Sequence, residues 1–275
     1  METDYLLITD DGTSTLFLEE YKQAMHTISG AYNEALLKHV IPSNILNSSK
    51  TELNILDIGF GIGYNVLALM NELINRKKRF KLNIISLEKE KSFSKYMNNV
   101  IFNDEKDLLY NFIREAYYSG NGTYNEINLK ILFGDARLTL DMLKDKKFNA
   151  IFHDPFSPSK NPELWSVDFF LRLRGIMSED CILTTYSSAD HIRRAMIEAQ
   201  LLVGIGPSVG KKREGTIASI NKNIIEIDND RKNAITENIN SIPYRDPALD
   251  LSREKILENR LIEIAQAKNK LNNSA

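Results

Sequence analysis

The chain of 275 residues has a single cysteine, Cys181, and no long hydrophobic run. One cysteine cannot close an intrachain disulfide or supply a cysteine-type zinc site. Its apolar neighbours favour a buried strand position over a nucleophile. No stretch approaches the ~20 apolar residues that cross a bilayer, and the acidic start Met1-Glu2-Thr3-Asp4 does not resemble a signal peptide. We therefore expect a folded cytoplasmic protein with no membrane partner.

An excess of positive charge is also missing, because 35 Lys and Arg face 37 Asp and Glu, a formal net charge of −2. Phosphate binding depends on Lys and Arg, so this balance argues against a protein that coats nucleic acid along its whole surface. Short basic segments remain at Arg193-Arg194 and Lys211-Lys212-Arg213, and each is either a local basic face or a solvated surface run. The four histidines show no ligand spacing, so no metal is assigned.

What is present is a hydrophobic content of 43%, ample for a core, arranged in three parts. Residues 1–45 contain a hairpin around an Asp-Gly turn and a helix over 30–40, which together form a small N-terminal β-cap. Residues 50–227 alternate strands and helices, with an insertion at about 104–128. Residues 228–275 are a C-terminal extension that ends in a helix over 252–269.

The alternation in the central part predicts the fold class. Strands are expected over 53–57, 82–87, 129–133, 148–153 and 181–186, and helices over 64–75, 91–100, 108–118, 137–143, 165–175 and 188–199. This order requires a mostly parallel sheet with helices on both faces, a Rossmann-like α/β fold. Antiparallel strands at the sheet edge are expected over 204–210, 217–221 and 224–227.

A glycine-dense turn, Asp57-Ile58-Gly59-Phe60-Gly61-Ile62-Gly63, separates the first of these strands from its helix. Glycine permits the tight turn and the close approach of a nucleotide-like ligand to the backbone. A dinucleotide fingerprint has the spacing G-x-G-x-x-G, whereas here the third glycine comes one residue earlier and an acidic residue precedes the first. The pattern D-x-G-x-G-x-G resembles motif I of S-adenosylmethionine (SAM) methyltransferases.

Two acidic residues follow neighbouring strands at the edge where open α/β sheets bind ligands. Glu88 stands about 25 residues beyond the glycine turn, a spacing that suits a carboxylate accepting both ribose hydroxyls of an adenosine. The alternative is the start of a charged surface turn. Asp135, in Gly134-Asp135-Ala136, either accepts from an adenine amino group or caps the next helix, and both uses can coexist.

A stiff acidic loop, Asp154-Pro155-Phe156-Ser157-Pro158-Ser159-Lys160-Asn161-Pro162, follows the fourth strand. Its three prolines fix the direction of Asp154 and Phe156 at little entropic cost. A carboxylate followed by Pro and an aromatic ring resembles the amine-binding loop of nitrogen methyltransferases. Such a loop can orient an amine or accept its proton, while a structural Asp-Pro turn is the alternative. His153, beside Asp154, is expected to be a buried histidine with a fixed tautomer.

Together these motifs resemble the MnmC-type family of SAM-dependent methyltransferases, which completes 5-methylaminomethyl-uridine at the tRNA wobble position. The resemblance covers most of residues 4–220. The loop from Asp154 to Trp165 is its most specific part. The others are Asp11-Gly12-Thr13, Tyr21, His26, Gly30-Ala31, the glycine turn, Glu88, Gly134-Asp135-Ala136, the segment from Thr184 to Ala189, Arg193-Arg194 and the segment from Gly210 to Glu214.

This resemblance implies SAM as cofactor, tRNA as partner and the primary amine of 5-aminomethyl-(2-thio)uridine as methyl acceptor. It implies that Asp154 and Phe156 are catalytic and face the aminomethyl-uracil. The implied cofactor contacts are Asp57, Gly59, Gly61, Gly63, Glu88, Asp135, Ala136 and Asp154. The implied substrate and tRNA contacts are Tyr21, His26, Lys160, Tyr186, Arg193, Lys211 and Arg213.

The bacterial two-domain members of this family also carry a flavin oxidase. This chain has no second nucleotide fingerprint, so it resembles the methyltransferase-only form, and we expect a separate enzyme to supply the aminomethyl precursor. One departure is Pro155, where the two-domain form usually has Gly. The insertion at 104–128 and the chain after 225 match no motif, and the sequence leaves open the tRNA species, the thiolation of the uridine and the oligomeric state.

Two other functions remain alternatives. One is an aminopropyltransferase of the spermidine-synthase type, which has a similar sheet and acidic ribose contact but no need for basic segments. The other is a catalytically silent RNA-binding module that keeps the fold as a scaffold. Activity on putrescine without RNA would favour the first, and RNA affinity without SAM binding would favour the second.

Overall fold

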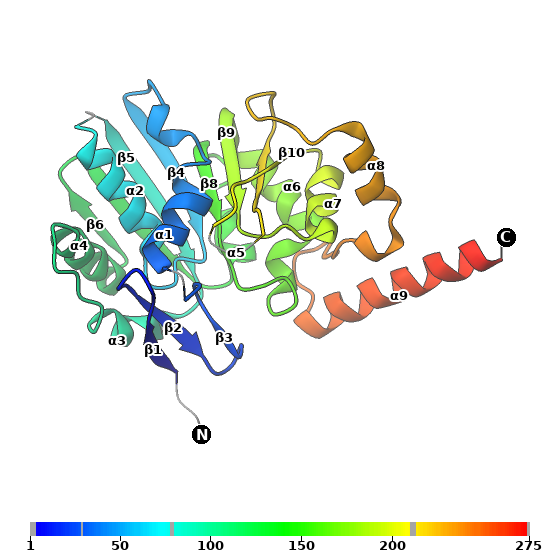
Figure 1. The fold of residues 1–275 in the computed structure, drawn as a ribbon, viewed down its shortest axis with the longest axis horizontal. Coiled ribbons are helices and arrows are strands. Elements are labelled where there is room, and N and C mark those ends of the chain that lie inside the picture. The colour runs from blue at the N-terminus through cyan, green and yellow to red at the C-terminus, as the bar shows by residue number, and fades with distance from the viewer. Residues whose placement is uncertain (1–3, 29, 78–79, 210–212, 274–275) are drawn as a thin grey trace.

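The computed structural model describes residues 4–28, 30–77, 80–209 and 213–273. Within them, eight strands form one twisted sheet in the order β10-β11-β9-β8-β4-β5-β7-β6 (Figure 1). The strands are β4 (Glu52–Ile58), β5 (Lys81–Glu88), β6 (Asn121–Tyr124), β7 (Ile127–Phe133), β8 (Phe148–His153), β9 (Met177–Thr185), β10 (Leu202–Ile205) and β11 (Thr216–Ser219). The five central strands pair in parallel, and β6, β10 and β11 pair antiparallel at the edges.

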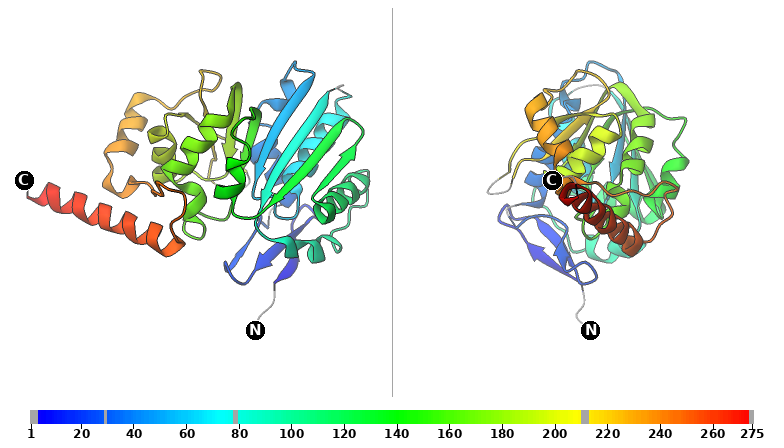
Figure 2. Two further views of the ribbon diagram at one scale, coloured as in Figure 1. Left: turned by 180° about the vertical axis from the view of Figure 1, so that it is seen from behind. Right: turned by 90° about the vertical axis from the view of Figure 1, so that its right-hand side faces the viewer.

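Helices cover both faces of this sheet (Figures 1 and 2). The α-helices of the described residues are α1 (Ala31–Ala35), α2 (Tyr64–Asn75), α3 (Ser94–Met97), α4 (Lys106–Ser119), α5 (Ala136–Asp141), α6 (Val167–Ile176), α7 (Asp190–Glu198), α8 (Asn229–Glu237) and α9 (Arg253–Asn272). Strand residues alternate between two apolar clusters: Ile55 packs with α1, α2 and α4, and Leu56 packs with α5, α6 and α7. This alternation places the two clusters on opposite faces, as expected for a buried sheet.

The N-terminal segment forms a separate three-stranded sheet, β1 (Tyr5–Ile8), β2 (Ser14–Leu18) and β3 (Gln23–Ala24). It lies below the carboxyl ends of the central strands in Figure 1. Short helical turns complete the chain: η1 (Leu36–Val40), η2 (Ile45–Asn47), η3 (Lys91–Phe93), η4 (Pro162–Trp165) and η5 (Ile239–Ser241). The expected cap of hairpin and helix thus has an additional short strand, β3.

The first part of the C-terminal segment, residues 228–256, contributes side chains to the main core. Ile235, Tyr244, Leu249 and Ile256 belong to the same apolar cluster as α6 and α7. Arg260 still donates to the carbonyls of Ile242 and Asn240, and the rest of α9 extends away from the body of the molecule (Figures 1 and 2). Four side chains between residues 228 and 256 therefore contribute to the apolar core beside α6 and α7.

Three predicted elements differ from the observed ones. The helix expected over 91–100 ends at Met97, as η3 followed by α3. The strand expected over 204–210 is β10, which ends at Ile205, while Gly210 lies outside the described residues. The segment 224–227 forms one isolated bridge, Gly204 to Glu226, and no strand. A missed helix, α8, buries only Ile235 among its described residues, so its sequence has no amphipathic period to reveal it.

Within the described residues, none of the helices is both long enough and apolar enough to cross a bilayer.

Candidate active site

An open pocket of about 1000 Å³ lies at the carboxyl ends of β4, β5, β7 and β8. In parallel α/β sheets this edge is where ligands bind. Its wall combines the glycine turn after β4, the acidic end of β5, the Gly134–Ala136 turn after β7 and the proline-rich loop after β8. The N-terminal cap contributes Tyr21 and His26, and the start of α9 contributes Arg253. The pocket thus collects chain segments from all three parts of the sequence.

Gly59 and Gly61 form part of the pocket wall, with φ angles of 86° and 58°. A Cβ on Gly59 would lie 2.5 Å from the carbonyl oxygen of Asp154, so only glycine permits this approach of the two loops. Gly63 is instead the N-cap of α2, and a Cβ there would meet Ile113 and Phe60. Gly63 therefore supports the turn, and its predicted direct contact with the cofactor stays a prediction.

Asp57 lies behind the pocket and not in its wall. Its side chain is fully buried and accepts hydrogen bonds from Asn65 Nδ2 at 3.2 Å and Ser86 Oγ at 3.0 Å. Desolvation raises the pKa of Asp57 to about 6. The side chain of Asp57 therefore connects β4 to Asn65 at the start of α2, and its predicted cofactor contact stays a prediction.

Glu88 ends β5 in the pocket wall with an almost completely buried carboxylate. Oε2 accepts from the backbone N–H of Gly61 and Oε1 from that of Glu90, each at 2.8 Å. Each oxygen keeps a lone pair for a further donor. Desolvation raises the pKa of Glu88 to about 7, despite the two backbone hydrogen bonds. A ligand that brings two hydroxyl donors fits this carboxylate.

Asp135 both caps α5 and reaches the pocket, so the two uses left open by the sequence coexist. Its Oδ1 accepts from the backbone N–H of Arg137 at 2.9 Å, and its Oδ2 pairs with Arg137 Nη2 at 2.7 Å. Burial raises its pKa, but the bonds and charge of Arg137 outweigh burial and hold the pKa below its usual value. Gly134 and Ala136 also line the pocket beside it.

Asp154 begins the loop after β8 and is held from two sides. Oδ2 accepts from Asn65 Nδ2 at 3.1 Å, and Oδ1 lies 3.4 Å from His39 Nε2. The side chain is 18% exposed, so it still reaches the pocket. Burial raises its pKa, but the charge and hydrogen bond of His39 prevail and hold the pKa below its usual value. Asp154 is therefore an ionised acceptor at neutral pH.

Two hydrogen bonds to backbone oxygens fix the rest of the loop. Tyr186 donates its hydroxyl to the carbonyl of Pro155 at 2.8 Å, and Trp165 donates Nε1–H to the carbonyl of Phe156 at 2.9 Å. These bonds add to the stiffness that proline provides. The side chain of Phe156 consequently has a defined place in the pocket wall.

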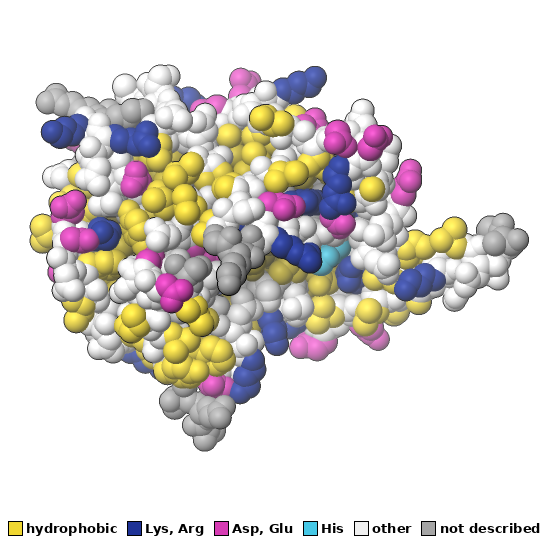
Figure 3. Space-filling model, in the orientation of Figure 1, with side chains coloured by type: hydrophobic (Ala, Val, Ile, Leu, Met, Phe, Trp, Pro, Cys, Tyr) yellow, Lys and Arg dark blue, Asp and Glu magenta, His cyan; other side chains and the backbone are white. Residues whose placement is uncertain are grey.

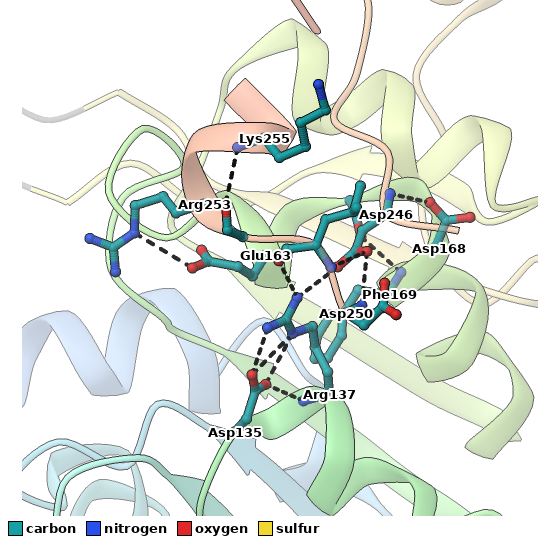
Figure 4. A network of polar contacts seen from close by, with 12 residues as sticks. Asp135, Arg137, Glu163, Asp168, Phe169, Asp246, Asp250, Arg253 and Lys255 are labelled. Carbon is teal, nitrogen blue, oxygen red and sulfur yellow. Dashed lines mark hydrogen bonds and ion pairs between the residues drawn. The ribbon is translucent and has the colours of Figure 1, made fainter. Parts of the chain in front are cut away.

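An aromatic and cationic stack forms another part of the pocket wall. Tyr21 and Phe156 are stacked with ring centroids 4.1 Å apart and planes within 10°. The guanidinium of Arg253 lies over the outer face of Tyr21 at 5.3 Å, and its Nε is 3.5 Å from Glu163 Oε1 (Figure 4). Flat rings suit a planar heterocycle, and the neighbouring cation suits a negatively charged group attached to that heterocycle.

Arg193, predicted to contact phosphate, has partners within the protein, and the phosphate contact stays a prediction. Its side chain is 1% exposed and lies between α7 and β11. Nε donates to Thr216 Oγ1 at 3.0 Å, and Nη2 donates to the carbonyl of Gly215 at 3.1 Å and pairs with Glu214 at 3.3 Å. A buried guanidinium needs such partners, so this arginine secures the edge of the sheet.

The other predicted substrate contacts fall into two groups. Tyr186 and His26 line the pocket. Lys160 is on the proline-rich loop but not in the pocket wall, and Arg213 lies at a separate shallow hollow beside Arg231. Lys211 lies outside the described residues. The pocket wall therefore contains the predicted substrate contacts with ring side chains, Tyr186 and His26, whereas Lys160 and Arg213 lie outside it.

His153 is fully buried, as expected, with a fixed tautomer. Nε2–H donates to the carbonyl of Leu164 at 2.8 Å, and burial lowers its pKa to about 4. The part of the chain that the structure describes contains no group of three His, Cys, Asp or Glu side chains arranged to hold a metal ion.

The comparisons with known proteins agree with this geometry. Residues 105–221 match a family model described as S-adenosyl-L-methionine-dependent methyltransferase. The solved structure of MnmC2 from Aquifex aeolicus superimposes with a TM-score of 0.86 at 31% identity, and covers 97% of this chain and 86% of that one. The chain belongs to the MnmC-type methyltransferase family. The predicted family, the Rossmann-like α/β fold, the enzyme class and SAM as cofactor are thereby confirmed.

Two relatives are similar to this chain over different shares of their own lengths. An uncharacterized protein of Methanocaldococcus jannaschii is 32% identical over 280 residues, 98% of this chain and 75% of that protein. The tRNA 5-methylaminomethyl-2-thiouridine biosynthesis bifunctional protein MnmC of Leptospira interrogans is 29% identical over 184 residues. That match covers 62% of this chain but 28% of the bifunctional protein. This MnmC-type chain thus corresponds to about a quarter to a third of such relatives.

The residues of the pocket fit SAM. Glu88 has two oxygens with free lone pairs for a ribose. A Cβ on Gly61 would lie 3.2 Å from Met25 Sδ, so a side chain at this position would crowd the space beside the turn. We propose that Gly59, Gly61, Glu88, Asp135 and Ala136 hold the cofactor, with Asp154 at its reactive end.

Replacing Glu88 with glutamine should weaken SAM binding about 10- to 100-fold, because each charge-assisted hydrogen bond is worth about 1.5–3 kcal/mol. In the wild type, ribose hydroxyls bind the ionised carboxylate. Since the pKa of Glu88 is raised to about 7, affinity should fall as the pH drops below 7, by up to about tenfold per pH unit. Calorimetric titration with SAM between pH 5.5 and 8.5 measures both effects. A wild-type affinity that is flat across this range would contradict the assignment, and Glu88→Gln should remove the pH dependence.

Proposed function

We propose that this protein transfers the methyl group of SAM to the primary amine of 5-aminomethyl-(2-thio)uridine at the tRNA wobble position. The observation that carries the proposal is an ionised carboxylate, Asp154, set between an aromatic wall and the edge of the sheet that fits SAM. The Leptospira interrogans relative, whose name includes 5-methylaminomethyl-2-thiouridine biosynthesis, supports the choice of amine.

Asp154 suits an amine because it offers oxygen acceptors and no donor. When bound, SAM would supply a methyl group on a sulfonium: the amine lone pair would form the new C–N bond, and sulfur would keep the electrons of the broken C–S bond. The task of Asp154 is to accept the N–H groups, so that the lone pair points away from the carboxylate. Asn65 and His39 hold the carboxylate in place for this purpose.

The walls of the pocket suit the rest of the nucleotide. The Tyr21–Phe156 stack offers an aromatic surface to a uracil removed from its base stack. Lys89 and Arg253 line the pocket and can meet flanking phosphates. Basic and acidic side chains are interspersed over the face that Figure 3 shows. Because this mixture favours no long phosphate track, we place the RNA contacts around the pocket mouth.

The test is methyl transfer from labelled SAM to tRNA that carries 5-aminomethyl-uridine at the wobble position, followed by nucleoside analysis. We expect labelled 5-methylaminomethyl-uridine, and no label in the same tRNA with an unmodified uridine. Absence of that product would refute the proposal. Product formation from putrescine and decarboxylated SAM without RNA would assign the pocket to aminopropyl transfer instead.

Supply of the amine by a separate enzyme and a cytoplasmic location remain predictions of this proposal. Cell fractionation and the modification state of tRNA in a strain without the gene would test them.

A further inference from the structure

His39 is a fully buried histidine directly behind the proposed amine acceptor. It lies on η1, against the ends of β8 and β9, with a side chain 1% exposed. Nε2 is 3.4 Å from Asp154 Oδ1, and Nδ1 is 3.2 Å from Thr184 Oγ1. Both ring nitrogens therefore face oxygen atoms that can accept a hydrogen bond.

The charged surroundings of His39 are acidic. Asp154 on the loop after β8, Asp57 on β4 and Glu34 on α1 face it and raise its pKa, against the effect of burial, which lowers it. The nearby His153 is neutral, because burial lowers its own pKa to about 4. From α2, Asn65 contributes an uncharged amide that donates to both Asp57 and Asp154.

We propose that His39 is a positioning residue that pairs with Asp154 as an imidazolium, so that the pocket presents a net-neutral acceptor and the bound amine reacts as its free base. This inference rests on the proposed function, because it concerns an amine acceptor. His39 does not touch the substrate. It acts through Asp154 by its charge and by fixing the direction of the carboxylate.

The physical reason is a conflict between binding and reaction. A primary amine with an ordinary pKa near that of lysine, about 10.4, is an ammonium at neutral pH, and an ammonium has no lone pair. A lone carboxylate would raise that pKa further, by about 1–3 units at contact distance, and so hold the amine in its unreactive form. A buried positive charge behind the carboxylate offsets this attraction, while the oxygens still accept N–H bonds. The proton leaves the ammonium for solvent before methyl transfer, and the methylated ammonium later releases its own.

The test compares wild type with His39→Gln, whose amide nitrogen can replace Nε2 as a donor to Asp154 without the charge. The readout is kcat for methylation of tRNA bearing 5-aminomethyl-uridine, with SAM saturating, from pH 6 to 9.5. We expect the acid limb of the His39→Gln profile to move up by about one pH unit or more. Its kcat at pH 7 should fall about tenfold and approach the wild-type value at pH 9.5. The KM for SAM should stay within about threefold of the wild-type value.

A matched control is His191→Gln, a mostly buried histidine that packs against Tyr244 and does not line the pocket. Its profile should coincide with that of the wild type. A His39→Gln profile lowered by one factor at all pH values would mean a merely structural role, and an unchanged profile would mean no role; either overturns the inference.

A second measurement does not require a stable variant. Nitrogen-15 NMR of the histidine rings in the wild type should show His39 doubly protonated at pH 7, and Asp154→Asn should lower the pH at which it loses its proton. A neutral His39 at pH 7 overturns the inference by itself. If the wild type shows no methyl transfer to the amine, the proposed function fails and the inference about the amine falls with it. An active wild type with a neutral His39 refutes the inference alone.

Discussion

Replacing Asp154 with asparagine will reduce kcat for methyl transfer by about 10²-fold or more, the cost associated with a misoriented reacting group. The variant keeps the size of the side chain, but its amide has one acceptor oxygen and adds a donor that opposes the amine N–H groups. SAM affinity should change less than threefold, because Glu88 and the glycine turn carry the cofactor contacts proposed above. Single-turnover kinetics with labelled SAM, together with calorimetry, separate the two effects.

The matched control is Asp180→Asn, a half-exposed carboxylate that pairs with Lys50 at the other end of the sheet. It should leave both kcat and SAM affinity unchanged. If Asp154→Asn weakened SAM instead, and Glu88→Gln lowered kcat with SAM affinity intact, the two sites would have been assigned the wrong way round.

The fold was predictable because its strands are continuous apolar runs followed by glycine or acidic turns. In β4, β5 and β8 both faces of the strand are covered, so the sequence of each strand is a mostly apolar segment that ends at a turn. Helix α8 and strand β6 were missed for the opposite reason. They lie at the periphery, bury little apolar surface and take their structure from the Asp228 cap and from pairing with β7.

The site was predictable where a side chain ends a strand. Glu88, Asp135 and Asp154 each follow a buried run, and parallel strands bring their carboxyl ends to one edge. His39 and Asn65 left no such signal. Each sits within a helical segment, where an isolated polar residue on a buried face looks the same whether it supports a catalytic group or fills the core. The packing of η1 and α2, which brings these two residues to Asp154, cannot be predicted from the local sequence.

The C-terminal segment was the least predictable part, because its tie to the pocket joins distant residues. Arg137, which pairs with Asp135, also donates Nη1–H to Asp246 at 2.8 Å and to the carbonyl of Leu251 at 2.9 Å (Figure 4). Asp246 is fully buried and also accepts from the backbone N–H groups of Asp250 and Leu251 at 3.0 Å. One guanidinium thus connects the cofactor edge to the turn that leads into α9.

Replacing Arg137 with methionine will destabilise the protein by about 3 kcal/mol, the lower end of the cost of breaking a buried ion pair. The cost arises because Asp246, with no exposed surface, loses its counter-charge and keeps only its two backbone donors. The variant should also bind SAM more weakly, since Asp135 loses its side-chain partner. Urea unfolding followed by fluorescence, with and without SAM, measures both quantities.

Two further variants decide whether charge is the cause. Arg137→Met combined with Asp246→Asn should recover most of the lost stability, because asparagine still accepts the backbone N–H groups without a buried charge. Arg172→Met breaks another Arg–Asp pair of the same 2.7 Å length as the Arg137–Asp135 pair, but one whose side chains are more than half exposed, and it should cost no more than about 1 kcal/mol. If the double variant were as unstable as Arg137→Met alone, lost packing rather than the uncompensated Asp246 would hold the C-terminal segment to the cofactor edge.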